Sequence, residues 1–354
     1  MSEAPRSAHH AWLALKLRSR LPRCEPRAAR HLARAVAGGA AAECAPLFEN
    51  PFTVEDLLVF DDATLRLLLA THAYGLTVGD LSCALHDAPE VVRCRIAGAL
   101  PPDDRTRFAA HRRDPVDGDV AGVARQRLLD AFFWELTYWK TPELYEELTA
   151  GERLHPGIFQ RLAPAIRGRV VLDAGAGTGR ATRECLRLGA QRVYAMEPSP
   201  GLSRILRRKL AASSPCRVTL LPGRFDAIPL DDDTVDLALC CSAFTAGPDQ
   251  GGEEGLAELR RVTRPGGRIV LIWPRPADYR WLAAHGFRYV ALTVSPRMAV
   301  RYPSLAAALR VARRFYARKR AVVHHLLRTR RPVVPFSLLG DNPPHDYCWL
   351  TVEK

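Results

Sequence analysis

The sequence predicts an α/β domain over residues 131–354, preceded by an all-helical region over residues 1–130. Two observations predict these classes. In the second part, short continuous apolar runs alternate with helical stretches, which is typical of a parallel sheet covered on both faces. In the first part, apolar residues recur at helical spacing and no strand-like alternation occurs. With 354 residues, the chain is long enough for two separate hydrophobic cores.

The N-terminal region is expected to be a compact set of short helices. "AWLALKLRSRL" and "PRAARHLARAVAGG" have apolar residues three to four positions apart, and the second stretch ends at Gly38–Gly39, a common helix end. Later blocks such as "TVGDLSCAL" begin at Thr or Asp, whose side chains cap helices by accepting hydrogen bonds from backbone amides.

Seven apolar runs predict the strands of one mostly parallel sheet in the second part. Helical stretches separate the first five runs, and a long basic helix is expected between the last two. The aromatic stretch "FFWELTYWKTPELY", which precedes the first run, is more typical of a core, although its rings could instead cover a cationic ligand. The seven runs are "RVVLDAGA", "RVYAMEP", "RVTLLPG", "VDLALCCS", "RIVLIWP", "FRYVALTV" and "DYCWLTVEK".

Cysteine usage and hydropathy predict a cytoplasmic protein. The nine cysteines are scattered without a C-x-x-C pair, which is typical of free thiols in a reducing compartment and argues against a disulfide framework or a zinc site. No apolar run reaches the ~18 residues of a membrane span. The N-terminus is interrupted by arginines and lacks the apolar core of a signal peptide.

The net charge of +13 is unevenly distributed, and the segment from Arg297 to Arg331 contains no acidic residue. A basic face can attract nucleic acid. Arginine is used heavily along the whole chain, however, and most charge runs are solvated helix faces, so the sequence favours that simpler interpretation.

The stretch "VVLDAGAGTGR" predicts a strand, a glycine-rich turn and a helix, a shape that often holds a nucleotide. A dinucleotide fingerprint requires glycine or alanine where Arg180 stands, and a phosphate loop would require G-K-[S/T]. Asp173 lies two residues before the first glycine and would repel a diphosphate. The turn therefore excludes phosphate-bearing nucleotides.

A nucleoside with a positively charged tail would suit this turn, although a phosphate-bearing nucleotide would not. Asp173 would attract an ammonium or sulfonium group, and the glycines would allow the backbone to approach the ligand closely. Glu197 follows the second predicted strand at the spacing where an acid binds ribose hydroxyls in nucleotide-binding sheets. A ribose joined to a cationic amino-acid tail describes S-adenosyl-L-methionine.

These motifs resemble those of the class I S-adenosylmethionine-dependent methyltransferases, which have a Rossmann-like fold. "VLDAGAGTG" is similar to the family's first motif, and "MEPS", "GRFDAIPLDDDTVDLAL" and "ELRRVTRPGGRIVLIWP" are similar to later ones. The resemblance covers roughly residues 130–354 and implies a seven-stranded, mostly parallel sheet. By that resemblance the cofactor-binding residues are Asp173, Ala174, Gly175, Gly177, Thr178, Gly179, Glu197, Pro198, Phe225, Asp226 and Ser242.

Within this set, the resemblance assigns the methionine part to Asp173, Gly175 and Gly177, and the ribose to Glu197. The chain departs from the family in the loop "GRFDAIP", residues 223–229, which by the resemblance contacts the adenine and is called the adenine loop. Relatives usually place an acid directly after the loop glycine, where this sequence has Arg224. The adenine contact is therefore assigned to Phe225 and Asp226.

The sequence identifies neither a catalytic residue nor the methyl acceptor. Methyl transfer to a good nucleophile needs mainly proximity and alignment, and a base is needed only when the acceptor must lose a proton. "CCSAFTAGP" follows the fourth strand where amino-group methylases of DNA or protein glutamine carry N/D-P-P-Y/F, which argues against those two acceptors. The favoured acceptor is a small molecule or a protein partner recruited by the helical region. Candidate bases are Ser242, Thr245, Asp249, Tyr279 and His155, each also explicable as a loop or surface residue.

A second stretch, Ala45 to Phe132, resembles the C-terminal helical domain of the flagellar motor switch protein FliG. "LFENPFTVEDLLVFDDATLRLLL" and "DPVDGDVAGVARQRLLDAF" carry the resemblance. The sequence departs from that family's functional charges at His86–Asp87 and Asp117, so the resemblance implies a docking module for a protein partner, without motor function.

Two alternative functions of the protein stay open: a non-catalytic protein that binds S-adenosylmethionine and acts through its helices, and an RNA methyltransferase.

Overall fold

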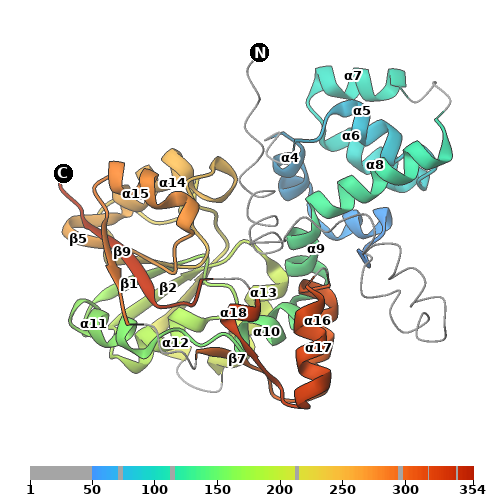
Figure 1. Ribbon diagram of the computed structural model, residues 1–354. Coiled ribbons are helices and arrows are strands. Elements are labelled where there is room, and N and C mark those ends of the chain that lie inside the picture. The colour runs from blue at the N-terminus through green and yellow to red at the C-terminus, as the bar shows by residue number, and fades with distance from the viewer. Residues whose placement is uncertain are drawn as a thin grey trace. The chain divides into compact units, whose positions relative to one another are not determined.

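The computed structural model describes residues 50–70, 75–111, 116–211, 215–293, 298–317, 319–339 and 342–354. The helices expected before residue 50 lie outside this part of the chain. The protein divides into two compact units, which are described separately (Figure 1). The helical unit consists of Met1–Lys140, Glu147–Gly151 and Ala299–Asn342, and the sheet unit of Thr141–Glu146, Glu152–Met298 and Pro343–Lys354.

The described N-terminal residues are helical, as the sequence predicts. Threonine and aspartate begin these helices: the Thr77 side chain accepts a hydrogen bond from the Asp80 amide, and Asp117 accepts one from the Asp119 amide. Both caps satisfy amides that the helix leaves without a partner. The elements are the 3-10 helix η3 (Val54–Val59) and the α-helices α4 (Asp62–Ala70), α5 (Val78–Ala84), α6 (Glu90–Ala99), α7 (Pro102–His111), α8 (Gly118–Ala131) and α9 (Phe133–Lys140).

The first aromatic residues of "FFWELTYWKTPELY" belong to the core of the helical unit. Phe132, Phe133 and Trp134 are buried, and the Trp134 ring stacks on Phe315 with centroids 5.4 Å apart. The interpretation of these rings as core residues is therefore confirmed, and burial removes them as a cover for a ligand. The stretch continues into α10 (Pro142–Ala150).

A segment near the C-terminus also belongs to the helical unit. It contains the two-stranded antiparallel sheet of β7 (Ala299–Arg301) and β8 (Val333–Pro335) with helices α16 (Leu305–Phe315), α17 (Arg320–Thr329) and α18 (Phe336–Leu339). The sequence predicted one long basic helix here, but α16 ends at Tyr316, whose backbone leaves the helical conformation and whose side chain is buried. The predicted domain boundary near residue 130 stays a prediction.

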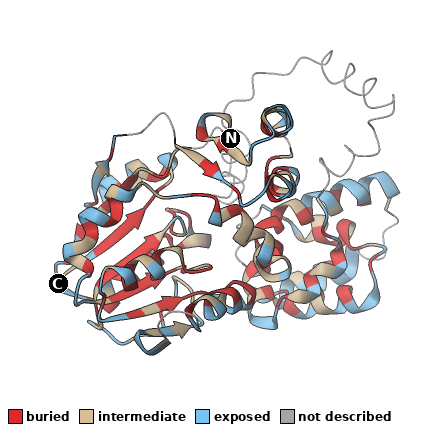
Figure 2. Ribbon diagram, turned by 90° about the horizontal axis from the view of Figure 1, so that it is seen from below, coloured by how far each residue is buried: buried red, intermediate tan, exposed pale blue. Residues whose placement is uncertain are grey.

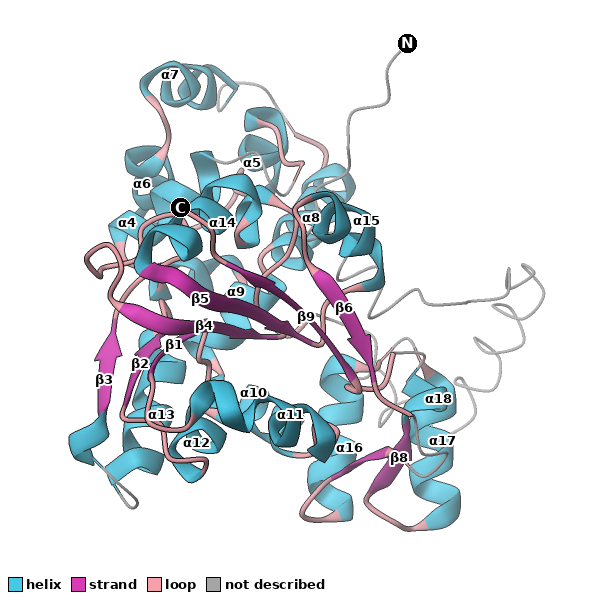
Figure 3. Ribbon diagram, turned by 90° about the vertical axis from the view of Figure 1, so that its left-hand side faces the viewer, coloured by secondary structure: helices cyan, strands magenta, loops and turns pink. Residues whose placement is uncertain are grey.

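The sheet unit contains one seven-stranded sheet (Figure 3). Its strand order is β3-β2-β1-β4-β5-β9-β6, and only β9 runs antiparallel to its neighbours. The prediction of a mostly parallel, seven-stranded Rossmann-like sheet is confirmed. The strands are β1 (Val170–Ala174), β2 (Arg192–Met196), β3 (Val218–Leu221), β4 (Val235–Cys241), β5 (Thr263–Ile272), β6 (Arg288–Ala291) and β9 (Asp346–Thr351).

The order of the strands reverses at β1, which has β2 on one side and β4 on the other. Ligands of open α/β sheets bind at such a switch point, outside the carboxyl ends of the strands. The central strands are buried on both faces, which accounts for their continuous apolar sequence (Figure 2). The accompanying helices are α11 (Pro156–Ile166), α12 (Arg180–Arg187), α13 (Pro200–Ala211), α14 (Gly252–Val262) and α15 (Tyr279–Ala284).

Short 3-10 turns complete the described elements. They are η4 (Pro215–Arg217), η5 (Pro248–Gln250) and η6 (Pro276–Asp278). None of the helices that the structure describes combines the length and the apolar character needed to cross a membrane.

Candidate functional site

The glycine-rich turn lies at the switch point, between β1 and α12. Gly175, Gly177 and Gly179 all have positive φ, at 73°, 57° and 90°. Side chains rarely adopt this conformation, which explains the choice of glycine. The amides of Gly175 and Ala176 donate to the Met196 carbonyl at 3.0 and 2.8 Å, so the turn is fixed to the carboxyl end of β2.

The three glycines have different surroundings. A Cβ atom on Gly175 would lie 2.5 Å from the Cβ of Ala243, and one on Gly179 would lie 2.4 Å from Leu206 Cδ1. These two glycines are needed for packing. A Cβ on Gly177 would meet no described atom within 4 Å. Gly177 therefore borders open space, from which a ligand can approach the backbone.

Asp173, the last but one residue of β1, has a carboxylate that is completely buried. Thr182 Oγ1 donates to Asp173 Oδ2 at 2.5 Å, whereas Oδ1 has no hydrogen-bond partner among the described residues. Burial raises the pKa of Asp173 to about 6, against the opposing effect of the Thr182 hydrogen bonds. Because buried polar atoms are rarely left unpaired, this oxygen is available to a positively charged or hydrogen-bond-donating ligand.

Glu197 follows β2 and is also buried. Its Oε2 accepts from the Gly177 amide and its Oε1 from the Ser199 amide, both at 2.8 Å. Burial raises the pKa of Glu197 to about 7. The two amide hydrogen bonds lower it, and the charge of Asp173 raises it further. A carboxylate accepts about four hydrogen bonds, so two positions remain for hydroxyl groups of a ligand.

The structure places the two predicted adenine contacts in different surroundings. Phe225 is half-buried beside the turn, with its ring edge-on to Phe244 at a centroid distance of 5.3 Å. A Cβ on Gly175 would lie 3.4 Å from the Phe225 ring. Asp226 is exposed and forms an ion pair with Arg224 at 3.5 Å. Phe225 is therefore brought to the turn, while Asp226 faces solvent.

The remaining predicted residues surround the turn. Ala174 and Thr178 are buried, and the Thr178 carbonyl accepts from Lys209 Nζ at 3.0 Å. Pro198 is exposed next to Glu197. Ser242, which follows β4, has a φ of 59°, and its amide donates to the Ile272 carbonyl at 2.9 Å. Its backbone conformation is therefore held by β5.

The sequence interpretation missed a polar cluster beside the turn, made by the buried Glu152 and the half-buried Tyr145, Arg180 and Cys241. Arg180 Nη2 lies 3.1 Å from Glu152 Oε2. Burial, opposed by the Arg180 charge, raises the pKa of Cys241 to about 12, so its thiol stays protonated. Burial also raises the pKa of Tyr145, against the same arginine. One signal was available: a cation at the first position of α12 opposes the helix dipole and therefore needs a tertiary partner.

Three of the five candidate bases, His155, Thr245 and Tyr279, have partners for their side chains. His155 Nδ1 accepts from the Gly157 amide at 3.1 Å and caps α11, and Tyr279 Oη donates to Asp346 Oδ2 at 2.7 Å. Thr245 Oγ1 accepts from the Gly247 amide at 3.2 Å. The side chain of Asp249 lies outside the described part of the chain. Within that part, no three His, Cys, Asp or Glu side chains are grouped to hold a metal ion.

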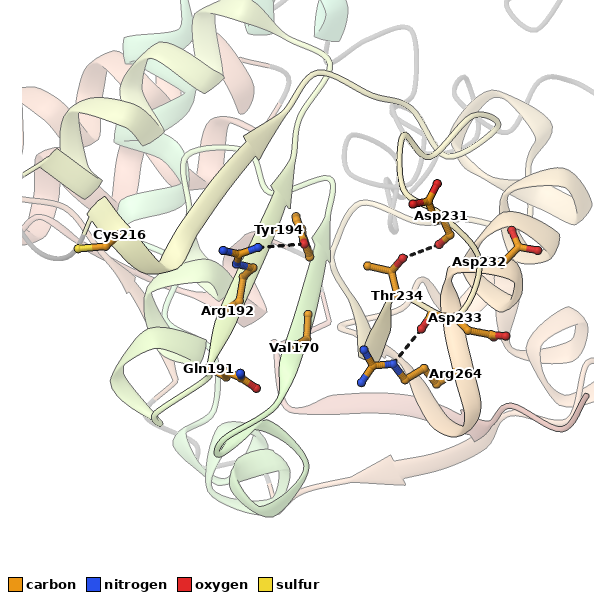
Figure 4. A pocket seen from close by; sticks show the side chains of 10 residues that line it. All are labelled: Val170, Gln191, Arg192, Tyr194, Cys216, Asp231, Asp232, Asp233, Thr234 and Arg264. Atoms are coloured by element: carbon orange, nitrogen blue, oxygen red, sulfur yellow. Dashed lines mark hydrogen bonds between the residues drawn. The ribbon is translucent and has the colours of Figure 1, made fainter.

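A cavity of about 570 Å³ lies at the opposite, amino edge of the sheet (Figure 4). Its aspartates and Arg264 are exposed, and polar groups of its lining already have partners: Arg264 donates to the Asp233 carbonyl at 2.8 Å, and Thr234 donates to the Asp231 carbonyl at 2.7 Å. Its lining contains no buried carboxylate. The residues that line it are Val170, Gln191, Arg192, Tyr194, Cys216, Asp231, Asp232, Asp233, Thr234 and Arg264.

Comparison with known proteins shows what part of the sheet unit is similar to. A family model described as "Methyltransferase domain" matches residues 171–267, which include the turn, Glu197 and the adenine loop. This segment is a methyltransferase domain. An uncharacterized methyltransferase of Mycobacterium tuberculosis is 40% identical over 119 residues, which cover 33% of this chain and 44% of that protein. The chain thus spans less than half the length of that relative.

Two further proteins are similar to the methyltransferase domain. An uncharacterized methyltransferase of Geobacillus kaustophilus is 36% identical over 150 residues, which cover 41% of this chain and 66% of that protein. A crystal structure titled as a SAM-dependent methyltransferase from Aquifex aeolicus has a TM-score of 0.36 and 20% identity, over 42% of this chain and 89% of that one. The predicted class I methyltransferase identity is confirmed, and the FliG resemblance stays a prediction.

Proposed function

We propose that the sheet unit binds S-adenosyl-L-methionine and that the protein transfers the methyl group of this cofactor to an acceptor. The observation that carries the proposal is the buried Asp173 carboxylate, whose Oδ1 has no hydrogen-bond partner among the described residues. It lies at the carboxyl end of β1, where the adjoining turn borders open space at Gly177.

The charges of this site fit the cofactor better than they fit a phosphate-bearing nucleotide. Asp173 and Glu197 are both carboxylates, and both are buried. A phosphate beside them would be repelled strongly, because buried charges are screened little. A ligand with a cationic amino-acid tail and a ribose offers positive charge to Asp173 and hydroxyl donors to Glu197.

Each of the predicted cofactor residues has a role in this proposal. Asp173 would hold the amino-acid tail, Glu197 the ribose, and Phe225 the adenine, with Gly177 allowing close approach of the backbone. Ala174, Gly175, Thr178, Gly179, Pro198, Asp226 and Ser242 complete the proposed set. The departure at Arg224 leaves the adenine contact to Phe225, since Asp226 is exposed and pairs with Arg224.

The bound cofactor supplies an activated methyl group, and the protein's contribution is to align the acceptor with it. Cys241 and Tyr145 lie beside the turn as protonated groups, so neither is a ready base at neutral pH. We therefore propose an acceptor that is itself nucleophilic, in a small molecule or in a protein docked on the helical unit.

Cysteine usage supports a reducing compartment, such as the cytoplasm, as the site of this activity. All seven cysteines in the described residues are free thiols, at positions 83, 94, 185, 216, 240, 241 and 348. Proteins of oxidising compartments usually pair such residues.

Isothermal titration calorimetry with the full chain tests cofactor binding. We expect heat with S-adenosylmethionine and with S-adenosylhomocysteine, and none with the diphosphate-bearing dinucleotide NAD. The absence of heat with S-adenosylmethionine, or binding of NAD alone, would overturn the proposal.

A transfer assay then separates an enzyme from a binding protein. The chain is incubated with radiolabelled S-adenosylmethionine and a cell lysate, and the labelled products are sorted by size. Label in a small molecule or in a discrete protein supports methyl transfer. Cofactor binding without label in any product would identify a non-catalytic binding protein.

A further inference from the structure

The segment between β6 and β9 is rich in arginine. These two strands are hydrogen-bonded antiparallel neighbours, which a two-residue hairpin could connect. Residues 292–345 lie between them instead. No acidic residue occurs from Arg301 to Arg331, whereas this stretch carries the basic residues Arg301, Arg310, Arg313, Arg314, Arg318, Lys319, Arg320, Arg328, Arg330 and Arg331.

Some of these cations have partners that explain them. Arg310 forms an ion pair with Glu147 at 2.7 Å, and the Arg314 guanidinium lies over the Phe52 ring at 5.0 Å. Five others are exposed and form no ion pair with any residue that the structure describes. These are Arg301, Arg313, Arg328, Arg330 and Arg331.

Four of the five lie at one end of α17, and we call them the arginine cluster: Arg301, Arg328, Arg330 and Arg331. Arg328 belongs to the last turn of α17 and Arg330 caps its end. The pairing of β7 with β8 brings Arg301 to this end, since Arg301 pairs with Val333 and the next amide, of Tyr302, donates to the Pro332 carbonyl at 2.8 Å.

Helix stability accounts for only part of this cluster. A cation near a helix C-terminus is stabilised by the helix dipole, and this explains Arg328. Arg301 and Arg331 lie outside the helix and gain little from it. Four like charges close together repel one another unless an anionic partner neutralises them.

We propose that the arginine cluster binds the phosphate backbone of nucleic acid. Each of the four cations is an arginine, whose planar guanidinium matches a phosphate with two parallel hydrogen bonds. The sequence alone favoured a solvated helix face. The structure adds that these cations come from two elements of the fold and that their side chains form no ion pair with any described residue.

An anionic membrane fits the same surface less well. Helices that bind in a membrane interface present an apolar face beside their cations. In α17 the apolar residues Val322 and Leu326 are buried within the helical unit, and Leu327 is the one large exposed hydrophobic residue in the described part of the segment. The surface therefore offers charge without an apolar face to insert.

Fluorescence anisotropy with a labelled, mixed-sequence 20-nucleotide RNA tests the proposal, without S-adenosylmethionine present. If four phosphates are contacted, the logarithm of the binding constant falls with the logarithm of salt with a slope of about −0.7 per contact, or roughly a 50-fold loss between 50 and 200 mM salt. We expect the variant R301Q/R328Q/R330Q/R331Q to lose at least tenfold in affinity at 50 mM salt and most of this slope.

A matched variant, R161Q/R167Q/R207Q/R208Q, removes the same charge from exposed arginines of the sheet unit. We expect it to bind RNA within about threefold of the wild type. A smaller double variant, R328Q/R331Q, replaces the quadruple variant if circular dichroism shows that the latter is unfolded.

Equal losses of RNA affinity in the cluster variant and the matched variant would overturn the proposal. Failure of the wild type to bind RNA at 50 mM salt, including the case in which it binds vesicles of anionic phospholipid instead, would overturn it too.

Discussion

The two edges of the sheet carry acidic residues in opposite surroundings. At the carboxyl edge, Asp173 and Glu197 are buried, and burial raises the pKa of each. At the amino edge, three consecutive aspartates around the cavity are exposed. Ion pairs at that edge include Asp232–Arg261 at 2.8 Å and Asp236–Arg264 at 3.0 Å, and Asp233 pairs with Lys354.

The difference supports the carboxyl edge as the proposed ligand site. An exposed ion pair contributes roughly 0–1 kcal/mol and is common on any surface. A buried carboxylate costs several kcal/mol unless it is paired, so a fold retains one when something else requires it. The cavity of about 570 Å³ therefore lies at the edge without buried carboxylates, and we take burial of charge rather than cavity volume as the mark of the candidate site.

The largest effect that we expect is that of Asp173→Asn on cofactor affinity. Asparagine keeps the shape and can still accept from Thr182, but it removes the charge. The affinity for S-adenosylmethionine should fall by about 10- to 100-fold, the range for loss of a hydrogen bond to a charged group. Calorimetric titration measures this change.

The stability of Asp173→Asn separates a binding role from a structural one. We expect a free energy of unfolding within about 1 kcal/mol of the wild type, because relief of the buried charge offsets the cost of an unpaired amide group. Urea denaturation measures it. A large loss of stability with unchanged affinity would make Asp173 a structural residue and remove the distinction between the two edges.

Gly177→Ala and Gly168→Ala form a matched pair across the sheet. Both glycines have positive φ, 57° and 69°, and in neither case would a Cβ meet a described atom within 4 Å. Each substitution should cost about 1–2 kcal/mol of stability, because the left-handed conformation is strained for alanine. Only Gly177 borders the proposed ligand, so only Gly177→Ala should also weaken cofactor binding, by about tenfold.

Thermal denaturation and titration of both glycine variants provide the measurements. Wild-type affinity for S-adenosylmethionine in both variants would mean that the ligand does not approach the backbone at Gly177. Loss of affinity in Gly168→Ala as well would mean that strain is transmitted along β1, and the two edges would then not be independent.

The fold of the sheet could be predicted from the sequence because its signals are local. Continuous apolar runs such as "RVVLDAGA" and "VDLALCC" bury both faces of a strand, and the helices between them carry helical periodicity. The membership of residues 299–342 in the helical unit could not be predicted. It depends on contacts such as Trp134 with Phe315, which join segments far apart in the chain.

The parts of the candidate site that depend only on charge and on spacing along the chain could be predicted from the sequence. Asp173 and Glu197 could be identified because carboxylates beside a glycine turn repel a phosphate and suit a cationic ligand with a ribose. The structure brings both residues to the turn. The separate roles of the three glycines could not be predicted, because they depend on Ala243 and Leu206. The pairing of Arg180 with Glu152 depends equally on tertiary contact.

The ionisation of Asp173, at the carboxyl edge, should make both cofactor affinity and stability depend on pH. We expect this effect to be smaller than those of the substitutions above. The pKa of Asp173 is raised from 3.8 to about 6, so the folded protein holds more protons than the unfolded chain between about pH 4 and 6. Stability from this group is therefore present at low pH and is lost as the pH rises through about 6. Binding of a cationic ligand needs the ionised form, so affinity should rise about five- to tenfold from pH 5 to pH 8.

Comparison of the wild type with Asp173→Asn isolates this contribution from all other titrating groups. Titration calorimetry at pH 5, 6.5 and 8 should show the rise in affinity for the wild type only. The opposite trend, with tighter binding at pH 5 that depends on Asp173, would mean that the protonated carboxyl is the form that binds.

The smallest effect is expected at the amino edge. Asp232→Asn breaks an ion pair with Arg261 in which the aspartate side chain is 71% exposed. We expect a change in the free energy of unfolding within about 0.5 kcal/mol, as for most surface substitutions, and no change in cofactor affinity. Urea denaturation and calorimetric titration check both values. A tenfold loss of affinity in this variant would show that the amino edge also takes part in binding, and that buried charge alone does not mark the functional edge of the sheet.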